Sequence, residues 1–495
     1  MQSKFPFFLL ILLSSIMALS FNLANNNDKT SVKETITGYW IGLEPGSNDY
    51  EIVYKIQIND SNEYTCLEYG FENGYYDGHW NLDSISFSES KNTLYLYNME
   101  HNCSFHGQVN FKDQTISGII QSYEVNGPIV LKRIEEKAIK GLYPRGSTEN
   151  EKTSYNYRQP QLLNDGWETS TLENEDVNSQ LVIEAINKII KQEFMNITSL
   201  LIVKNNKLVC EEYFYGSDDS HLNKLGSCSK SVTSILFGIA IDQAKIKGVN
   251  EVVIDYFPEY KQLKTEENSK ILTKHLLTMT AGFDWDEYSV PYNHPQNTLL
   301  QMGESEDYLK YIFKRSIVDT PGEKFNYSCA NTILLGWILK KSTGMNPDRY
   351  AEQNLFNHLG IDKYYWHIRE DGFTHVEGGL KLTARDMAKI GSLILNNGKW
   401  NNDQIVSAEW IAESTHQHVP QNNWQPGYGY QWWNIYYPVQ DKTMYGIMAM
   451  GADPQMIIII PELNTIIVTT GPFTFVDEDK SPLRMIMQYI IPSLL

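Results

Sequence analysis

Short apolar runs alternate with turn residues through the early part of the chain, a pattern that is typical of β-structure. Between residues 36 and 134 these runs are rich in β-branched and aromatic side chains. Examples of the expected strands are residues 50–58, 84–87, 94–97, 107–111, 116–120 and 128–132. Their even spacing predicts a small all-β domain at residues 36–134, an antiparallel β-barrel or sandwich.

A change of composition follows this region. Residues 135–180 are rich in Ser, Asn, Glu, Gly and Pro, which is typical of a linker. Residues 181–495 then contain runs with the pattern of strands and runs with the pattern of helices, which predicts a second, larger α+β domain. Its expected strands are residues 198–204, 208–215, 428–437, 455–460 and 465–470, and its expected helices include one that a Thr383 to Asp386 capping box begins and one at residues 482–491.

The N-terminus has the pattern of a secretory signal peptide. Lys4 precedes an apolar run that ends in small residues near Ser20. We expect residues 1–20 to be removed and the mature protein to begin close to Phe21, outside the cytoplasm. An uncleaved membrane anchor is the alternative, although the apolar run is shorter than the ~20 residues that span a bilayer.

Composition and charge narrow the function classes. With 42% hydrophobic residues among 495, the chain is expected to be globular. A formal net charge of −19 argues against nucleic acid or an anionic membrane as a partner. We therefore expect a small-molecule or peptide-like partner and no stable membrane insertion, and we leave the oligomeric state open.

The chain has five cysteines, and the odd number leaves at least one thiol outside any intramolecular disulfide. Cys66 and Cys103, both in the early region, are the favoured pair. His101, Cys103 and His106 have some likeness to a metal-ligand set, but a β-hairpin with a disulfide explains them at least as well. We expect neither a metal nor another cofactor.

The most specific chemical signal is a serine and a lysine three residues apart at the start of an apolar helix. Ser227 and Lys230 lie on one helix face with roughly 5–6 Å between their Cβ atoms, so the amine can take the hydroxyl proton. The helix N-terminus favours the developing negative charge. Lys230 needs a pKa lowered from about 10.4, which the apolar residues 232–241 are expected to provide.

Two structural alternatives accompany this motif. Ser227 can instead be an ordinary N-cap with Lys230 solvated in the first turn. A second serine and lysine at the same spacing, Ser88 and Lys91, lie in a Ser/Asn-rich stretch between two expected strands. That context predicts an exposed turn without catalytic function.

Segments downstream of Ser227 resemble the serine β-lactamase and penicillin-binding-protein superfamily, in the branch of class C β-lactamases, esterases, D-aminopeptidases and amide-dimer hydrolases. The resemblance covers about residues 160–495. The segments that carry it, in order, are residues 226–234, 275–283, 321–328, 334–336 and 378–389. It implies a β-lactamase-like antiparallel sheet with a helical subdomain, and a serine hydrolase that forms an acyl-enzyme.

The second motif of this superfamily, Tyr-x-Asn, falls on Tyr327, Ser328 and Cys329. The resemblance implies that Tyr327 shuttles a proton between nucleophile and leaving group. Cys329 replaces the asparagine and lacks the amide donors and carbonyl acceptor that would position a substrate.

The third motif departs further. The resemblance places Ala452 where the superfamily has a cationic or ring side chain, and Pro454 where it has glycine. The N–H of Gln455 would then complete an oxyanion hole with the N–H of Ser227. An ordinary strand whose preceding turn contains a proline is an equally good interpretation.

Together these features predict a secreted serine hydrolase for esters or amides. Because Cys329 and Ala452 cannot hold an acyl side chain or a carboxylate as the superfamily does, we do not expect an efficient β-lactamase. The alternative is a catalytically weakened binding protein that keeps the fold.

Overall fold

A computed structural model describes residues 36–99, 102–122, 125–148, 151, 155–292, 294–422, 426–439, 442–452, 454–473 and 478–495. The expected signal peptide lies outside the described residues. In the described part of the chain, no helix is both long and apolar enough to cross a membrane. The chain forms two compact units: the first has the residues up to Gly46 with Tyr54–Leu67 and Asn81–Ile134, and the second has Ser47–Val53, Glu68–Trp80 and Glu135–Leu495.

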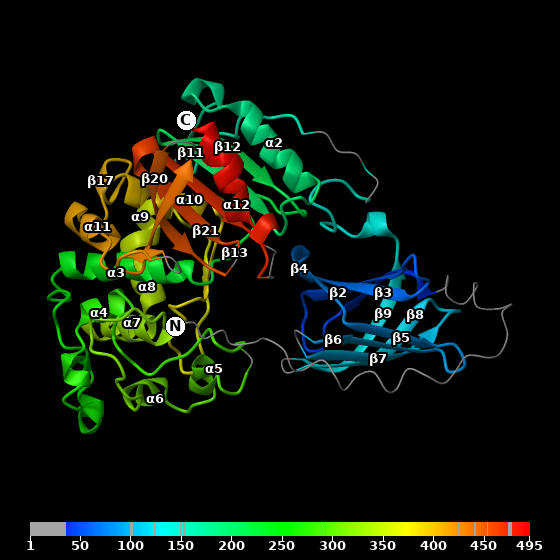
Figure 1. The fold of residues 1–495 in the computed structure, drawn as a ribbon, viewed down its shortest axis with the longest axis horizontal. Coiled ribbons are helices and arrows are strands. Elements are labelled where there is room, and N and C mark those ends of the chain that lie inside the picture. The colour runs from blue at the N-terminus through cyan, green and yellow to red at the C-terminus, as the bar shows by residue number, and fades with distance from the viewer. Residues whose placement is uncertain are drawn as a thin grey trace, which may run out of the picture. The chain divides into compact units, whose positions relative to one another are not determined.

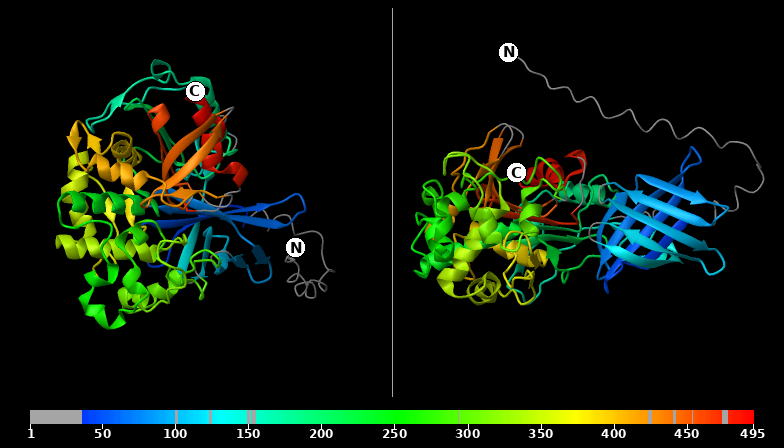
Figure 2. Two further views of the ribbon diagram at one scale, coloured as in Figure 1. Left: turned by 60° about the vertical axis from the view of Figure 1, so that its left-hand side comes forward. Right: turned by 90° about the horizontal axis from the view of Figure 1, so that it is seen from below.

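Nine strands of the early region form one curled sheet in the order β4-β3-β2-β1-β9-β8-β7-β6-β5 (Figure 2). In β7 and β9 buried and exposed residues alternate, as expected where one face of an antiparallel sheet is covered. The strands are β1 (Gly38–Leu43), β2 (Tyr50–Ile58), β3 (Tyr64–Glu72), β4 (Tyr75–Asn81), β5 (Ser84–Ser88), β6 (Thr93–Asn98), β7 (Cys103–Asn110), β8 (Thr115–Gln121) and β9 (Asn126–Ile134). The predicted all-β region is confirmed, whereas the predicted domain boundaries remain predictions.

The expected disulfide between Cys66 and Cys103 is wrong. No disulfide joins Cys66 to Cys103 in the structure. Cys66 lies on β3 and Cys103 on β7, and these strands are not neighbours in the sheet. Among the described residues no group of His, Cys, Asp and Glu is arranged to hold a metal ion, and His101 lies outside them.

The later region is built on an eight-stranded sheet in the order β10-β12-β11-β22-β21-β20-β19-β18. Every residue of β21 and β22 is buried, so both faces of the sheet are covered there and the apolar run is continuous instead of alternating. The strands are β10 (Glu168–Thr169), β11 (Ser199–Lys204), β12 (Lys207–Tyr213), β18 (Gly427–Tyr428), β19 (Trp433–Val439), β20 (Lys442–Met450), β21 (Met456–Ile460) and β22 (Thr465–Thr470).

Two small sheets accompany it. The first pairs β13 (Asn223–Lys224) and β14 (Tyr365–Trp366) with β15 (Leu380–Leu382), and the second pairs β16 (Lys399–Trp400) with β17 (Asp403–Gln404). Because β13 ends three residues before Ser227, its pairing with β15 fixes the backbone that leads to the nucleophile.

Helices surround the eight-stranded sheet (Figure 1). They are α2 (Ser179–Ile190), α3 (Cys228–Asp242), α4 (Thr273–Leu277), α5 (Thr298–Gly303), α6 (Tyr308–Phe313), α7 (Cys329–Thr343), α8 (Pro347–Ala351), α9 (Asn357–Leu359), α10 (Ala384–Leu395), α11 (Ala408–Thr415), α12 (Pro482–Met485) and α13 (Ile491–Ser493), with shorter 3₁₀ or π segments between some of them. α10 packs on β21 and β22, whereas α3 packs on α7 and β20. The predicted combination of a sheet with helices is confirmed.

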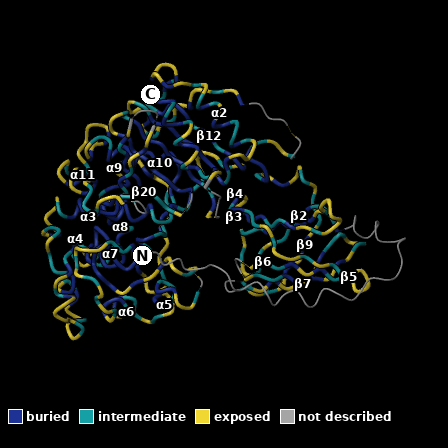
Figure 3. Tube along the Cα trace, viewed as in Figure 1, coloured by how far each residue is buried: buried dark blue, intermediate teal, exposed yellow. Residues whose placement is uncertain are grey.

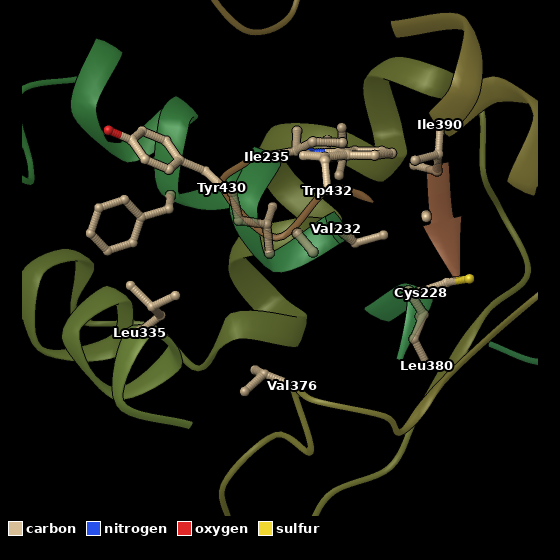
Figure 4. Packing of buried hydrophobic residues seen from close by; sticks show 14 of the residues in the cluster. Cys228, Val232, Ile235, Leu335, Val376, Leu380, Ile390, Tyr430 and Trp432 are labelled. Atoms are coloured by element: carbon tan, nitrogen blue, oxygen red, sulfur yellow. The ribbon is translucent and has the colours of Figure 1, made fainter. Parts of the chain in front are cut away.

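The helix that carries the serine and lysine is the centre of the core. Nearly all of α3 is buried (Figure 3). Figure 4 shows Val232 and Ile235 of α3 in the same apolar cluster as Leu335 of α7 and Trp432. Polar residues of α3, which include Lys230 and Thr233, are buried together with the apolar ones, so the helix lies inside the core and not on its surface. The predicted cap of α10 is also present, because Thr383 accepts a hydrogen bond from the Asp386 N–H at 3.1 Å.

Candidate active site

Ser227 and Lys230 are in contact at the start of α3. Lys230 Nζ lies 2.8 Å from Ser227 Oγ. Ser227 occupies the N-cap position but already has helical dihedral angles, φ −66° and ψ −9°, and its side chain makes no capping hydrogen bond. Lys230 is only 1% exposed. The structure thus disagrees with the alternative of an ordinary N-cap and a solvated lysine.

Lys230 has two further neighbours. Its Nζ donates a second hydrogen bond to the carbonyl oxygen of Glu377 at 2.7 Å. The same atom lies 5.1 Å from the centroid of the Tyr327 ring. These contacts hold the amine in one place between the nucleophile, a backbone acceptor and the aromatic ring.

The expected lowering of the Lys230 pKa is wrong. Burial does lower this pKa, but electrostatic interactions with Cys329, Glu287 and Glu377 raise it by more, so that it lies above its ordinary value. Burial also raises the pKa of the Cys329 thiol well above its usual range, so at neutral pH that group is uncharged.

Tyr327 lies on the other side of the nucleophile, just before α7. Its ring is 7% exposed and stacks on Trp433, with centroids 5.8 Å apart and planes 13° apart. Burial and the neighbouring Cys329 raise the pKa of Tyr327 well above its ordinary value, and a side-chain hydrogen bond with Ser227 lowers it in part. In the resting site both Lys230 and Tyr327 therefore carry their protons.

Gln455 lies beside the nucleophile turn. Its carbonyl oxygen accepts a hydrogen bond from Cys228 Sγ at 3.4 Å, which places it next to the residue after Ser227. Its side chain is buried. The side-chain nitrogen donates a hydrogen bond to the Gly471 carbonyl, and the side-chain oxygen accepts one from the Gly471 N–H. Among the described residues, no hydrogen bond uses the N–H of Ser227 or of Gln455. Both groups are available as oxyanion donors, and this role remains a prediction.

The structure also places Cys329 and Ala452 at the site. The Cys329 thiol is buried, and its backbone N–H donates to Oε2 of Glu287. Ala452 is exposed in the turn between β20 and β21, and a Cβ on Gly226 would lie 3.4 Å from its nitrogen. Asp453 lies outside the described residues, whereas Pro454 is buried just before β21. The interpretation of this turn as part of the site is supported by its position beside Gly226.

Two acidic residues near Lys230 were missed by the sequence analysis. Glu287 is 2% exposed, and its Oε2 accepts from Trp285 Nε1 at 2.6 Å as well as from Cys329. Its Oε1 has no hydrogen-bond partner. Glu377, the second acid, is 4% exposed. Both lie in loops far from Ser227 in the sequence. Glu287 follows the acidic residues Asp284 and Asp286, which resemble a solvated surface, and Glu377 is an isolated acid before Gly378 and Gly379.

Aromatic rings form the outer wall of the site. Tyr288 is 64% exposed and its ring centroid lies 5.6 Å from that of Tyr327. Tyr292 is 54% exposed and lies next to Tyr288. An uncharged substrate group can pack against these faces without displacing a charged partner. The second serine and lysine pair offers no such surroundings: Lys91 is exposed in a turn, whereas Ser88 is half-buried and is the last residue of β5 instead of part of the predicted turn.

A family model described as Beta-lactamase matches residues 191–473, more than half of the chain. A 6-aminohexanoate-dimer hydrolase of Paenarthrobacter ureafaciens is 27% identical over 223 residues, which cover 43% of this chain and 55% of that protein. The chain thus spans about half the length of this curated relative. The solved structure of EstCE1, a hydrolase with promiscuous acyltransferase activity, has a TM-score of 0.52 at 14% identity and covers 65% of this chain and 98% of its own. This likeness confirms the predicted β-lactamase-like fold.

Proposed function

The chain belongs to the Beta-lactamase family, and on that premise we propose that it hydrolyses ester or amide bonds through an acyl-enzyme on Ser227. The observation that carries the proposal is the 2.8 Å contact between Lys230 Nζ and Ser227 Oγ in a buried site that also contains Tyr327. A serine and a lysine that share this spacing by chance on the protein surface would be exposed, whereas these two are buried together.

The proposed reaction begins when Lys230 loses a proton to solvent. The neutral amine then takes the hydroxyl proton of Ser227 as Oγ bonds to the substrate carbonyl carbon. The N–H groups of Ser227 and Gln455 stabilise the oxyanion. Tyr327 gives its phenolic proton to the leaving alcohol or amine as that bond breaks, and the Lys230 ammonium returns a proton to Tyr327. Water repeats the steps on the acyl-enzyme and releases the acid.

Substrate choice follows from the charges that face the site. Glu287 and Glu377 are carboxylates, and no cationic side chain occupies position 452. A substrate carboxylate beside the scissile bond would gain little from Cys329 or Ala452, and the nearby acids would repel it. The exposed rings of Tyr288 and Tyr292 instead offer contact to an uncharged group. We therefore propose neutral esters or amides as substrates, in preference to β-lactams.

A catalytically weakened binding protein is the second candidate. It is favoured by the same departures, Cys329 and Ala452, together with the raised pKa of both Lys230 and Tyr327. Such a protein would bind a carbonyl compound without turning it over.

The cellular site and the partners belong to the proposal as well. The basic and apolar N-terminus supports export and cleavage near Ser20, and the net charge of −19 supports a partner other than nucleic acid. Reading the N-terminal residue of the exported protein by mass spectrometry tests the first point. An intact Met1 in the membrane fraction would indicate an anchor instead.

Covalent labelling of Ser227 tests the proposed function. We expect a fluorophosphonate probe to label the wild-type protein and the Ser88→Ala control, and to leave Ser227→Ala unlabelled although that variant stays folded. Mass spectrometry of the labelled peptide identifies the residue. A labelled Ser227→Ala protein would overturn the assignment, and a wild-type protein that binds esters without labelling would favour the binding-protein candidate.

A further inference from the structure

Glu377 contributes two different groups to the surroundings of Lys230. Its backbone carbonyl accepts the hydrogen bond from Lys230 Nζ at 2.7 Å. Its side chain is a carboxylate that is only 4% exposed. One residue thus provides both the acceptor for the Lys230 amine and a buried acidic side chain.

Arg369 holds the buried carboxylate. Its guanidinium donates from Nη2 to Oε1 of Glu377, and the arginine side chain is itself only 10% exposed. His375 Nε2 lies 3.3 Å from the same oxygen. The other oxygen, Oε2, has no hydrogen-bond partner. The guanidinium also lies over the Tyr308 ring, 4.9 Å from its centroid, which limits the positions that Arg369 can take.

Most other groups around Lys230 are uncharged at neutral pH. The titratable groups that face it, or that feel its charge, are Cys228, Glu287, Tyr288, Tyr292, Tyr327, Cys329, His375, Glu377 and Tyr428. Burial raises the pKa of each thiol and phenol in this group and lowers the pKa of His375. The two acidic residues of this group are Glu287 and Glu377, and in the described part of the chain it is Glu377 that forms a salt bridge, with Arg369.

From this geometry we propose that Arg369 and Glu377 are positioning residues that set the proton affinity of Lys230 and hence the pH at which Ser227 becomes active. The inference rests on the proposed role of Lys230 as the base. The positive charge of Arg369 offsets part of the negative charge of Glu377. Removing the Arg369 charge therefore raises the proton affinity of Lys230. Neutralising Glu377 lowers that affinity.

The variants shift the activity profile in opposite directions. Glu377→Gln keeps the backbone carbonyl and the size of the side chain, so the ascending limb of kcat/KM against pH moves to lower pH. At a fixed pH on that limb we expect kcat/KM to rise about tenfold, the effect of one pH unit. Arg369→Gln moves the limb to higher pH, and Arg369→Lys restores the wild-type position by returning a cation.

A second measurement does not depend on turnover. Acetic anhydride modifies a neutral lysine amine and spares an ammonium, so competitive acetylation of Lys230 followed by mass spectrometry reports its titration. Glu377→Gln should begin to react at lower pH than wild type, and Arg369→Gln at higher pH. Glu211→Gln is the matched control, because it breaks another buried pair, with Arg385, whose side chains are 7% and 4% exposed. It should lower the melting temperature and leave the Lys230 titration unchanged.

The outcomes separate the two proposals. The inference is wrong if Lys230 reacts at the same pH in Glu377→Gln and Arg369→Gln as in the Glu211→Gln control. Arg369 and Glu377 would then have a merely structural role. If Ser227 fails to react with the fluorophosphonate in wild type, the proposed function is wrong, while acetylation still decides whether Glu377 controls Lys230.

Discussion

Replacing Tyr327 with phenylalanine tests the proton shuttle most directly. The change removes one hydroxyl group and leaves the ring, which stacks on Trp433 with centroids 5.8 Å apart and lies 5.1 Å from Lys230 Nζ. Neither contact depends on the hydroxyl oxygen. Tyr327→Phe is therefore expected to fold normally and to keep Lys230 in place, so that a loss of activity reports the missing proton donor.

The size of that loss follows from the role. A positioned general acid or base contributes about 10² to 10⁴ in rate, which corresponds to about 2.7 to 5.4 kcal/mol of transition-state stabilisation. We expect kcat for an amide substrate to fall by that factor with KM nearly unchanged, because an amine leaves only after it is protonated and the ring still forms the wall of the site. A p-nitrophenyl ester should lose less, since nitrophenolate leaves without a proton.

Tyr428→Phe provides the matched control. Tyr428 is 1% exposed and belongs to the same aromatic cluster, with its ring centroid 4.7 Å from that of Trp433. It loses a hydroxyl group in the same surroundings without a proposed proton-transfer role. Stopped-flow measurement of the acylation burst compares the two variants. A loss smaller than tenfold in Tyr327→Phe, or an equal loss in both, would refute the shuttle.

Three further outcomes are expected. Because the pKa of Lys230 is raised and only its neutral form can accept a proton, kcat/KM should increase with pH through the alkaline range; a profile that is flat or falls there would contradict the role of Lys230. Gln455→Pro removes the second oxyanion donor and should cost about 10² to 10³ in kcat, whereas Gln455→Ala, which keeps the N–H and loses only the bonds to Gly471, should cost far less. On one preparation kcat/KM for p-nitrophenyl butyrate should exceed that for nitrocefin, and the reverse order would restore β-lactamase as the favoured activity.

The parts of the site that the sequence could predict are those set by local geometry. Ser227 and Lys230 meet because residues three apart share a helix face, and the apolar residues after them predicted a buried helix. Thr383 caps α10 for a similarly local reason. Tyr327 required the resemblance to a family, since nothing in its own neighbourhood indicates that it meets a helix almost a hundred residues earlier.

The error over the Lys230 pKa shows why the rest could not be predicted. The apolar run after Lys230 correctly indicated burial, and burial alone does lower a lysine pKa. The opposing carboxylates, Glu287 and Glu377, reach Lys230 through loops whose paths depend on tertiary packing. In the sequence Glu287 belongs to the acidic run Asp284 to Glu287, and such a run ordinarily lies on the solvent-exposed surface.

Strand predictions failed where polar residues interrupt the pattern. β3 and β4 were missed because Glu, Thr, Asp and His stand among their aromatic residues, so the alternation is irregular. β20 was missed although it lies inside the eight-stranded sheet, since its first residues, Lys442 and Thr443, are polar. In both cases pairing with neighbouring strands outweighs a weak local preference.

The replacement of asparagine by Cys329 and the buried acid beside it have a common physical explanation. An asparagine amide at this position would offer its own donors and acceptor to a substrate. Cys329 offers none, and its backbone N–H is already bound to Glu287, a carboxylate that also accepts from Trp285. A carboxylate so deeply buried is tolerable only beside a cation, and Lys230 is the cation whose pKa it raises. If Ser227 is the nucleophile, as proposed, its activity should depend on the protonation of Lys230 more than on an anionic group of the substrate.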